Sequence, residues 1–202
     1  MYLRKLILWI ALMFSVYGNT QIIYGDNFTI EIKQTKINAF NFTSSSSWVI
    51  LPKDMEKLWV RIRITSKSKK RQFFNPNAFS IVSNEHKCRF RPAEAKFAYM
   101  MHGFKSFLIL NTDDKEELNS RYGRRRQENS RDIFLDYNLE GYKNIPMVIN
   151  YGTKRKPKNV SIYYASEKFS NKTIDYYFGV HNSLKSVDLY YKDQKITTIA
   201  IN

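Results

Sequence analysis

The sequence predicts an all-β protein, specifically an immunoglobulin-like antiparallel β-sandwich with an additional C-terminal β-hairpin region. The chain of 202 residues contains 14 Tyr, 14 Phe and 3 Trp but only 7 Gly and 5 Pro. Aromatic and β-branched residues favour strands. Short segments of alternating apolar and polar residues recur at intervals of about ten residues. The sequence contains no long amphipathic helical segment of the kind that a parallel βαβ fold requires.

Residues 1–18 have the features of a cleaved secretory signal peptide. Arg4 and Lys5 precede an apolar run at 6–16 (LILWIALMFSV), and Gly18 follows it as a small residue near the expected cleavage point. An uncleaved membrane anchor is the alternative, but the run is shorter than the roughly 20 residues that span a bilayer. Cys88 is the only cysteine, so an internal disulfide is excluded. We therefore expect export to a bacterial periplasm or cell surface, with secretion as the alternative.

The strands that follow the signal are predicted from period-two alternation and from the turn residues between them. Residues 93–101 favour one or two helical turns, and the polar residues 112–129 are expected to form a long exposed loop. A turn at 83–85 joins two strands, and a turn at Glu140 and Gly141 joins two more. The predicted strands span residues 28–37, 48–51, 57–65, 79–82, 86–91, 104–110, 131–137 and 145–151.

Three similar strands, each ending in a tyrosine doublet, are predicted after residue 151. They are VSIYY at 160–164, TIDYY at 173–177 and VDLYY at 187–191. A hairpin tip at Asp193 and Gln194 separates the last of them from KITTIAI. We expect a signal peptide at 1–18, an immunoglobulin-like sandwich at 19–151, and C-terminal strands at 152–202. These last strands would either extend the sandwich or form a small separate sheet.

The segments LWVRIRITSKSKKRQ, NAFSIVSNEHKCRFRP and RDIFLDYNLEGYKNIPMVINYG follow one another in an order and spacing that resemble a known family. They are similar to the telokin-like immunoglobulin-sandwich domains of exported bacterial proteins and lipoproteins of unknown function, over residues 28–151. The resemblance implies a non-catalytic binding or scaffolding domain and carries no catalytic residues. Two features depart from the family: no cysteine marks a lipid anchor after the signal, and residues 152–202 have no counterpart.

Two of the predicted strands carry cations and one tryptophan on the faces that we expect to be exposed. Residues two apart in a strand share a face, so Val60, Ile62 and Ile64 would point inward. If both strands belong to one sheet, their outward side chains share a surface suited to phosphate, sulfate or carboxylate, with a stacking plane for a sugar or base. A solvated face or a protein contact would show the same pattern. The predicted anion-binding residues are Trp59, Arg61, Arg63, Lys87, Arg89 and Arg91.

Further basic residues lie in predicted loops. The formal net charge is +15, although the composition of an AT-rich genome would also account for many of the lysines. Basic loops are usually only solvated, but clusters that converge at one end of a sandwich would form a patch for acidic glycans, lipid headgroups or nucleic acid. The loop residues are Lys69, Lys70 and Arg71, then Arg124, Arg125 and Arg126, then Lys154, Arg155 and Lys156.

Catalysis and metal binding are not predicted. His86 and Cys88 share a strand face, but neither a second ligand pair at zinc spacing nor a third catalytic group accompanies them. The sequence lacks a Gly-rich phosphate loop, a GxSxG motif and an HExxH motif. We expect no cofactor and a monomer with a polyanion or protein partner. The predicted function is an exported, non-catalytic binding or scaffolding domain. The alternative is a surface or matrix structural protein that uses its aromatic C-terminal hairpins, and a hydrolase using Cys88 or His86 ranks third.

Overall fold

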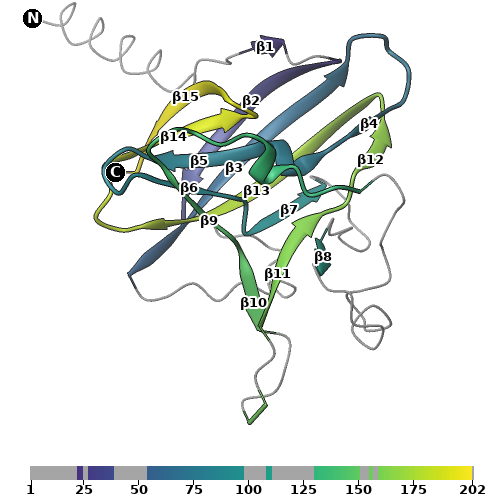
Figure 1. Cartoon of the computed structure of the whole chain (residues 1–202). Coiled ribbons are helices and arrows are strands. Elements are labelled where there is room, and N and C mark those ends of the chain that lie inside the picture. Colours follow the sequence, from purple (N-terminus) through teal and green to yellow (C-terminus); the bar gives the residue numbers. More distant parts are fainter. Residues whose placement is uncertain are drawn as a thin grey trace, which may run out of the picture.

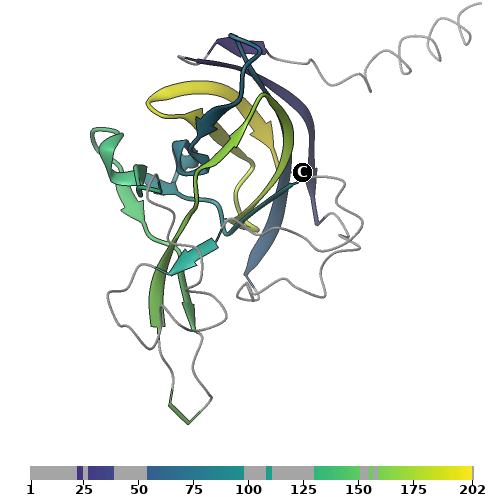
Figure 2. The ribbon, with the colours of Figure 1, turned by 90° about the vertical axis from the view of Figure 1, so that its right-hand side faces the viewer.

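Two five-stranded sheets enclose one hydrophobic core in the computed structural model of the protein (Figures 1 and 2). The structure describes residues 22–24, 27–38, 54–97, 108–110, 130–150, 155–156 and 159–201. The first sheet has the order β1 (Ile22–Tyr24), β2 (Phe28–Ile37), β3 (Met55–Ser66), β13 (Asn171–His181) and β7 (Glu94–Phe97). The second has the order β15 (Gln194–Ala200), β14 (Ser186–Tyr191), β5 (Phe79–Ser83), β6 (Cys88–Phe90) and β9 (Lys143–Ile145).

Smaller sheets and turns complete the fold. A two-stranded ribbon pairs β4 (Gln72–Phe74) with β12 (Glu167–Phe169), and a three-stranded sheet has the order β10 (Val148–Asn150), β11 (Asn159–Tyr164) and β8 (Leu108–Leu110). Two 3-10 turns are η2 (Pro76–Ala78) and η3 (Phe134–Asp136). The described strands pair antiparallel except β6 with β9, which run parallel. The predicted all-β, antiparallel sandwich is therefore confirmed, whereas the immunoglobulin-like topology stays a prediction.

The period-two alternation of β3 places its apolar side chains in the core. Val60, Ile62 and Ile64 are fully buried, as predicted, and the intervening residues face away from the core. The second sheet contributes to the same core from the other side, because the rings of Phe79 on β5 and Tyr176 on β13 lie 4.8 Å apart. Burial of such rings and branched side chains is the main source of stability in a fold with one free cysteine.

Two of the C-terminal strands occupy interior positions in the large sheets. β13 lies between β3 and β7, and β14 lies between β15 and β5. Residues 171–200 therefore belong to the two large sheets, whereas β11 and β12 pair within the smaller sheets. The β14–β15 hairpin turns at Lys192 and Asp193, close to the predicted tip, and Lys192 takes a left-handed conformation with φ 58°.

Two predicted elements are wrong where the structure describes them. The helical turns expected at 93–101 are replaced by strand β7, because pairing with β13 and burial of its side chains outweigh local helix propensity. The hairpin expected between 131–137 and 145–151 does not form. Instead, η3 interrupts the first segment, and the second divides at Pro146 into β9, which pairs with β6, and β10, which pairs with β11. The predicted turn at Gly141 is present, with φ 79°.

Several predictions fall outside the described residues. They concern the signal at 1–18, the strand at 48–51, the loop at 112–129 and most of the strand at 104–110, of which the structure describes β8. In the part of the chain that is described, no helix is long and apolar enough to cross a bilayer.

Candidate anion-binding surface

The predicted cationic face is divided between the two sheets. Arg61 and Arg63 lie on β3 of the first sheet, whereas Arg89 lies on β6 of the second. The prediction that these side chains share one solvent face is therefore wrong. Lys87 lies in the turn before β6, is exposed, and holds its ammonium 5.1 Å from the ring centroid of Tyr142.

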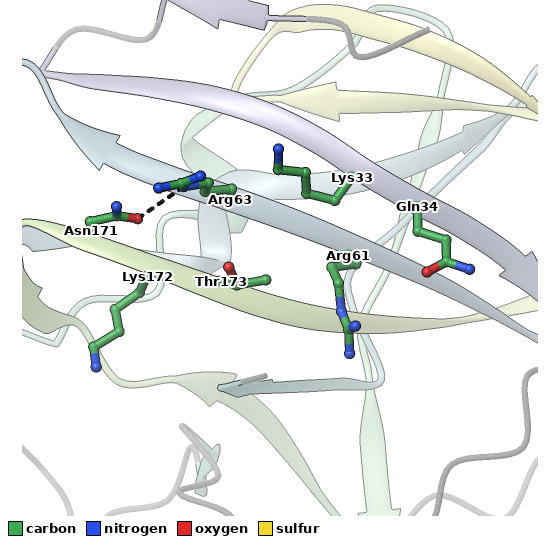
Figure 3. Close-up of a pocket in the computed structure, with 7 residues that line it drawn as sticks. All are labelled: Lys33, Gln34, Arg61, Arg63, Asn171, Lys172 and Thr173. Atoms are coloured by element: carbon green, nitrogen blue, oxygen red, sulfur yellow. Dashed lines mark hydrogen bonds between the residues drawn. The ribbon is translucent and has the colours of Figure 1, made fainter. Parts of the chain in front are cut away.

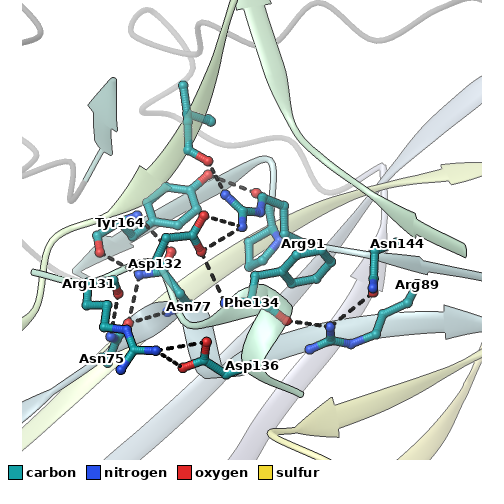
Figure 4. Close-up of polar contacts among 12 residues, drawn as sticks. Asn75, Asn77, Arg89, Arg91, Arg131, Asp132, Phe134, Asp136, Asn144 and Tyr164 are labelled. Atoms are coloured by element: carbon teal, nitrogen blue, oxygen red, sulfur yellow. Dashed lines mark hydrogen bonds and ion pairs between the residues drawn. The ribbon is translucent and has the colours of Figure 1, made fainter. Parts of the chain in front are cut away.

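Arg89 points into the protein and is completely buried. Its Nε donates to Ser80 Oγ at 3.0 Å. Its Nη1 donates to the backbone oxygen of Phe134 at 2.7 Å and to Asn144 Oδ1 at 3.2 Å (Figure 4). All three acceptors are neutral. Burial, together with the nearby charge of Arg91, lowers the pKa of Arg89 to about 10.

Arg91 is also buried and has a carboxylate partner. Its Nη2 lies 2.7 and 2.8 Å from the two carboxylate oxygens of Asp132, and its Nη1 donates to the backbone oxygen of Ile162. The guanidinium carbons of Arg89 and Arg91 lie 4.2 and 4.6 Å from the ring centroid of Phe134. Both arginines therefore fasten the segment around η3 to the second sheet, and they are not available to a ligand.

The burial of Arg89 and Arg91, which were predicted to be exposed, has a physical explanation. Alternation shows which side chains share a face, but it does not show which face contacts water. His86, Cys88 and Phe90 were expected inside, yet His86 is exposed and the other two are only half-buried. Arg89 and Arg91 can be buried because Asp132 and Phe134, which lie more than 40 residues later in the chain, contact their guanidinium groups.

On the first sheet, Arg61 is held by its neighbours. It lies opposite Asp175 in the β3–β13 register, and its Nε and Nη2 donate to the two carboxylate oxygens at 2.7 and 2.9 Å. The guanidinium carbon also lies 4.7 Å from the ring centroid of Trp59. Trp59 therefore supports Arg61, and this guanidinium occupies one side of its ring.

Arg63 lies in an open depression of about 540 Å³ on the outer face of β2, β3 and β13 (Figure 3). Its Nε donates to Asn171 Oδ1 at 3.3 Å, and within the described ranges this is its only protein hydrogen bond. Lys33 reaches the same depression from the β-bulge between Ile32 and Gln34. The lining residues are Lys33, Gln34, Arg61, Arg63, Asn171, Lys172 and Thr173.

The loop between β3 and β4 brings one of the predicted basic clusters beside this depression. The loop is fastened by the backbone bonds Ser66 N–H to Ser170 O, 2.7 Å, and Lys67 N–H to Asn27 O, 3.0 Å. Asn171, which contacts Arg63, immediately follows Ser170. We call the resulting surface the basic end, and it comprises Lys33, Arg63, Lys67, Lys69, Lys70, Arg71, Lys168 and Lys172.

The other basic clusters do not join the basic end where they are described. Arg155 and Lys156 are exposed in the connection between β10 and β11, at the opposite end of the molecule from the β3–β4 loop in both views (Figures 1 and 2). The cluster Arg124, Arg125 and Arg126, and Lys154, lie outside the described residues. The basic end therefore combines one predicted strand residue, Arg63, and one predicted loop cluster with cations that the sequence did not single out.

The side chains of His86 and Cys88 have different partners, and His181 lies between Ser183 Oγ, 2.7 Å from its Nδ1, and Asp54 Oδ2, 3.3 Å from its Nε2. Cys88 Sγ donates to the backbone oxygen of His86 at 3.2 Å, whereas the His86 ring faces the His181 ring at 5.9 Å. Among the described residues, no group of three His, Cys, Asp or Glu side chains is placed to hold a metal ion. The absence of catalysis stays a prediction.

The C-terminal tyrosines, proposed in the alternative interpretation as a contact surface, are mostly in the interior. Both members of the first two doublets are buried, and in the third doublet one is buried and the other half-buried. These residues are Tyr163, Tyr164, Tyr176, Tyr177, Tyr190 and Tyr191. They contribute to packing and give no support to an aromatic contact surface.

Comparison with protein families, with curated proteins and with solved structures finds no match to this chain. The resemblance to telokin-like domains therefore stays a prediction.

Proposed function

We propose that the protein is an exported, non-catalytic binding domain that holds a polyanion at the basic end. The features of residues 1–18 support export, with a bacterial periplasm or cell surface as the expected location. The ligand chemistry is a polymer with repeated phosphate or sulfate groups, because several cations of the basic end lie on strands and a loop that are fixed relative to one another.

The observation that carries this proposal is the hydrogen bonding of the Arg63 guanidinium. Among the described arginines of the first sheet, Arg61 has both carboxylate oxygens of Asp175, whereas Arg63 has only the neutral amide oxygen of Asn171. Nη1 and Nη2 of Arg63 therefore remain able to donate in parallel to an oxyanion. Asn171 orients the guanidinium through Nε without neutralising its charge.

Heparin binding as a function of salt tests the proposal. For about six ionic contacts, affinity should fall roughly 10³-fold between about 50 and 200 mM salt, because bound counterions are released on binding. Arg63→Gln should weaken binding and lower the slope of log K against log salt by about 1. Arg155→Gln is the matched control, since it removes an exposed cation at the far end. Salt-independent binding, or equal losses in the two variants, would rule out the basic end as the site.

A further inference from the structure

One side of the β4–β12 ribbon presents an aromatic ring among cations. Phe74 and Phe169 pack into the core, with ring centroids 5.7 Å apart. Phe73 precedes Phe74 on β4, so it lies on the opposite face of the ribbon, and it is 47% exposed. Its direct cross-strand neighbour is Lys168, whose ammonium lies 5.6 Å from the centroid of the Phe73 ring.

Arg71 is fixed beside this ring. Its Nε and Nη2 donate to the backbone oxygen of Lys168 at 3.3 and 3.0 Å. This places a charged planar group next to the Phe73–Lys168 pair, and no acidic side chain in the described part of the chain pairs with it. Leu135 and Val148, the other large hydrophobic side chains that are exposed in the described residues, are aliphatic and offer no ring for stacking.

The ring and the depression at Arg63 are close enough for one polymer to reach both. Lys168 and Asn171 are three residues apart in a nearly continuous extended segment, so their Cα atoms are separated by at most about 11 Å. Asn171 contacts Arg63, and Lys168 contacts Phe73. The cations of the β3–β4 loop lie at the same end.

We propose that Phe73 is a stacking platform and that the polyanion is a single-stranded nucleic acid. This inference rests on the proposed function and adds the class of ligand. Backbone-tracking cations combined with an exposed ring are the means by which proteins bind single strands without sequence preference. Every base has a π face that can stack on Phe73, whereas a sulfated glycan has none. A duplex would keep its bases stacked on one another and away from the ring.

Two oligomers of equal length and charge separate stacking from electrostatics. One is a short oligothymidylate, and the other is the same phosphodiester chain with an abasic spacer at each position. Fluorescence anisotropy at about 50 mM salt should show oligothymidylate binding about 5- to 150-fold more tightly, the effect of one stacked base. Phe73→Leu, which keeps an apolar side chain, should remove this difference and leave heparin and abasic binding unchanged. Phe73→Trp should retain the preference.

The outcomes distinguish the two proposals. Equal binding of the two oligomers to the wild type, or an equal loss for both in Phe73→Leu, would overturn the stacking platform. Binding of heparin without binding of oligothymidylate would assign the basic end to a glycan and overturn the nucleic-acid inference. If heparin and both oligomers fail to bind, the polyanion proposal itself fails.

Discussion

Asp175 lies directly opposite Arg61 across the β3–β13 pair and receives two hydrogen bonds from it, at 2.7 and 2.9 Å. Both side chains are largely shielded from water, with 19% of Arg61 and 11% of Asp175 exposed. The ion pair therefore helps to hold β3 against β13, and it also reduces the positive charge beside the depression at Arg63.

We expect Asp175→Asn to lower the free energy of unfolding by about 2 kcal/mol, because Arg61 would lose a charged, two-pronged partner in a partly dry site. Urea unfolding monitored by tryptophan fluorescence measures this change. Glu31→Gln is the control: Glu31 contacts Lys33 at 2.6 Å, but that pair is more exposed, so the loss should stay below about 1 kcal/mol. Equal losses in the two variants would contradict the assignment.

Phe134 and Leu135 provide a matched test of the anchored segment at η3. Phe134 is 1% exposed and contacts both buried guanidinium groups, whereas Leu135 is 60% exposed. Phe134→Ala should lower the free energy of unfolding by about 3–5 kcal/mol, since it removes a buried ring and leaves a cavity. Leu135→Ala should change it by less than about 0.5 kcal/mol. Similar effects in thermal unfolding would show that the arginines do not depend on Phe134.

Buried tyrosines predict a loss of stability at alkaline pH. Burial raises the pKa of Tyr164, Tyr176 and Tyr177 above the ordinary value of 10.0. A raised folded-state pKa contributes stability that is complete below pH 10 and is lost as pH rises further. Each tyrosine contributes a slope of about 1.36 kcal/mol per pH unit. The pKa of Arg89 is lowered to about 10, so above pH 10 the folded state loses this proton before the unfolded state does. This raises stability with pH and offsets the slope contributed by about one of the three tyrosines. Urea unfolding from pH 8 to 11.5 should show a decline that begins near pH 10.

Tyr176→Phe and Tyr164→Phe separate this pH effect from hydrogen bonding. The Tyr176 hydroxyl is buried with no hydrogen-bond partner in the described part of the chain, whereas the Tyr164 hydroxyl donates to Pro92 O at 2.9 Å. At pH 7, Tyr176→Phe should be neutral or stabilising, and Tyr164→Phe should lower the free energy of unfolding by about 1 kcal/mol. Both variants should show a shallower alkaline decline. A decline unchanged in both would mean that other groups cause it.

Lys69 allows stability and polyanion binding to be separated. It adopts a left-handed conformation with φ 60° in the β3–β4 loop, which is unfavourable for a residue with a Cβ. Lys69→Gly should raise the free energy of unfolding by about 0.5–1 kcal/mol and still weaken heparin binding, with a salt slope lower by about 1. Gly141→Ala, at φ 79° in another turn, is the control and should destabilise without affecting heparin. A stabilised Lys69→Gly variant with unchanged heparin affinity would remove Lys69 from the site.

The parts of the fold that depend on local alternation could be predicted from the sequence. The bounds of β2 coincide with the predicted 28–37, and β3 begins and ends within two residues of the predicted strand. The outward position of Arg63 followed from the same alternation. In contrast, the burial of Arg89 and Arg91 depends on Asp132 and Phe134, and alternation contains no information about partners so distant in the chain.

The remaining residues of the candidate site depended on strand register. Asn171 meets Arg63 only because β13 pairs with β3, and Lys33 turns toward the depression at a β-bulge that no local pattern indicated. Phe73 was missed for a similar reason, since a three-residue strand is too short for a detectable alternation. Its position opposite Lys168 could be known only from the β4–β12 pairing.

The central place of β13 has a consequence for biosynthesis. Until residues 171–181 have left the ribosome, β13 is missing, so β3 has one unpaired edge and β7 lacks the strand with which it pairs. Formation of the first sheet must therefore wait for nearly the whole chain, because this pairing joins residues more than 70 positions apart. Unpaired strand edges and exposed apolar surface favour aggregation, so we expect the aromatic strands that precede β13 to be most prone to it during this interval.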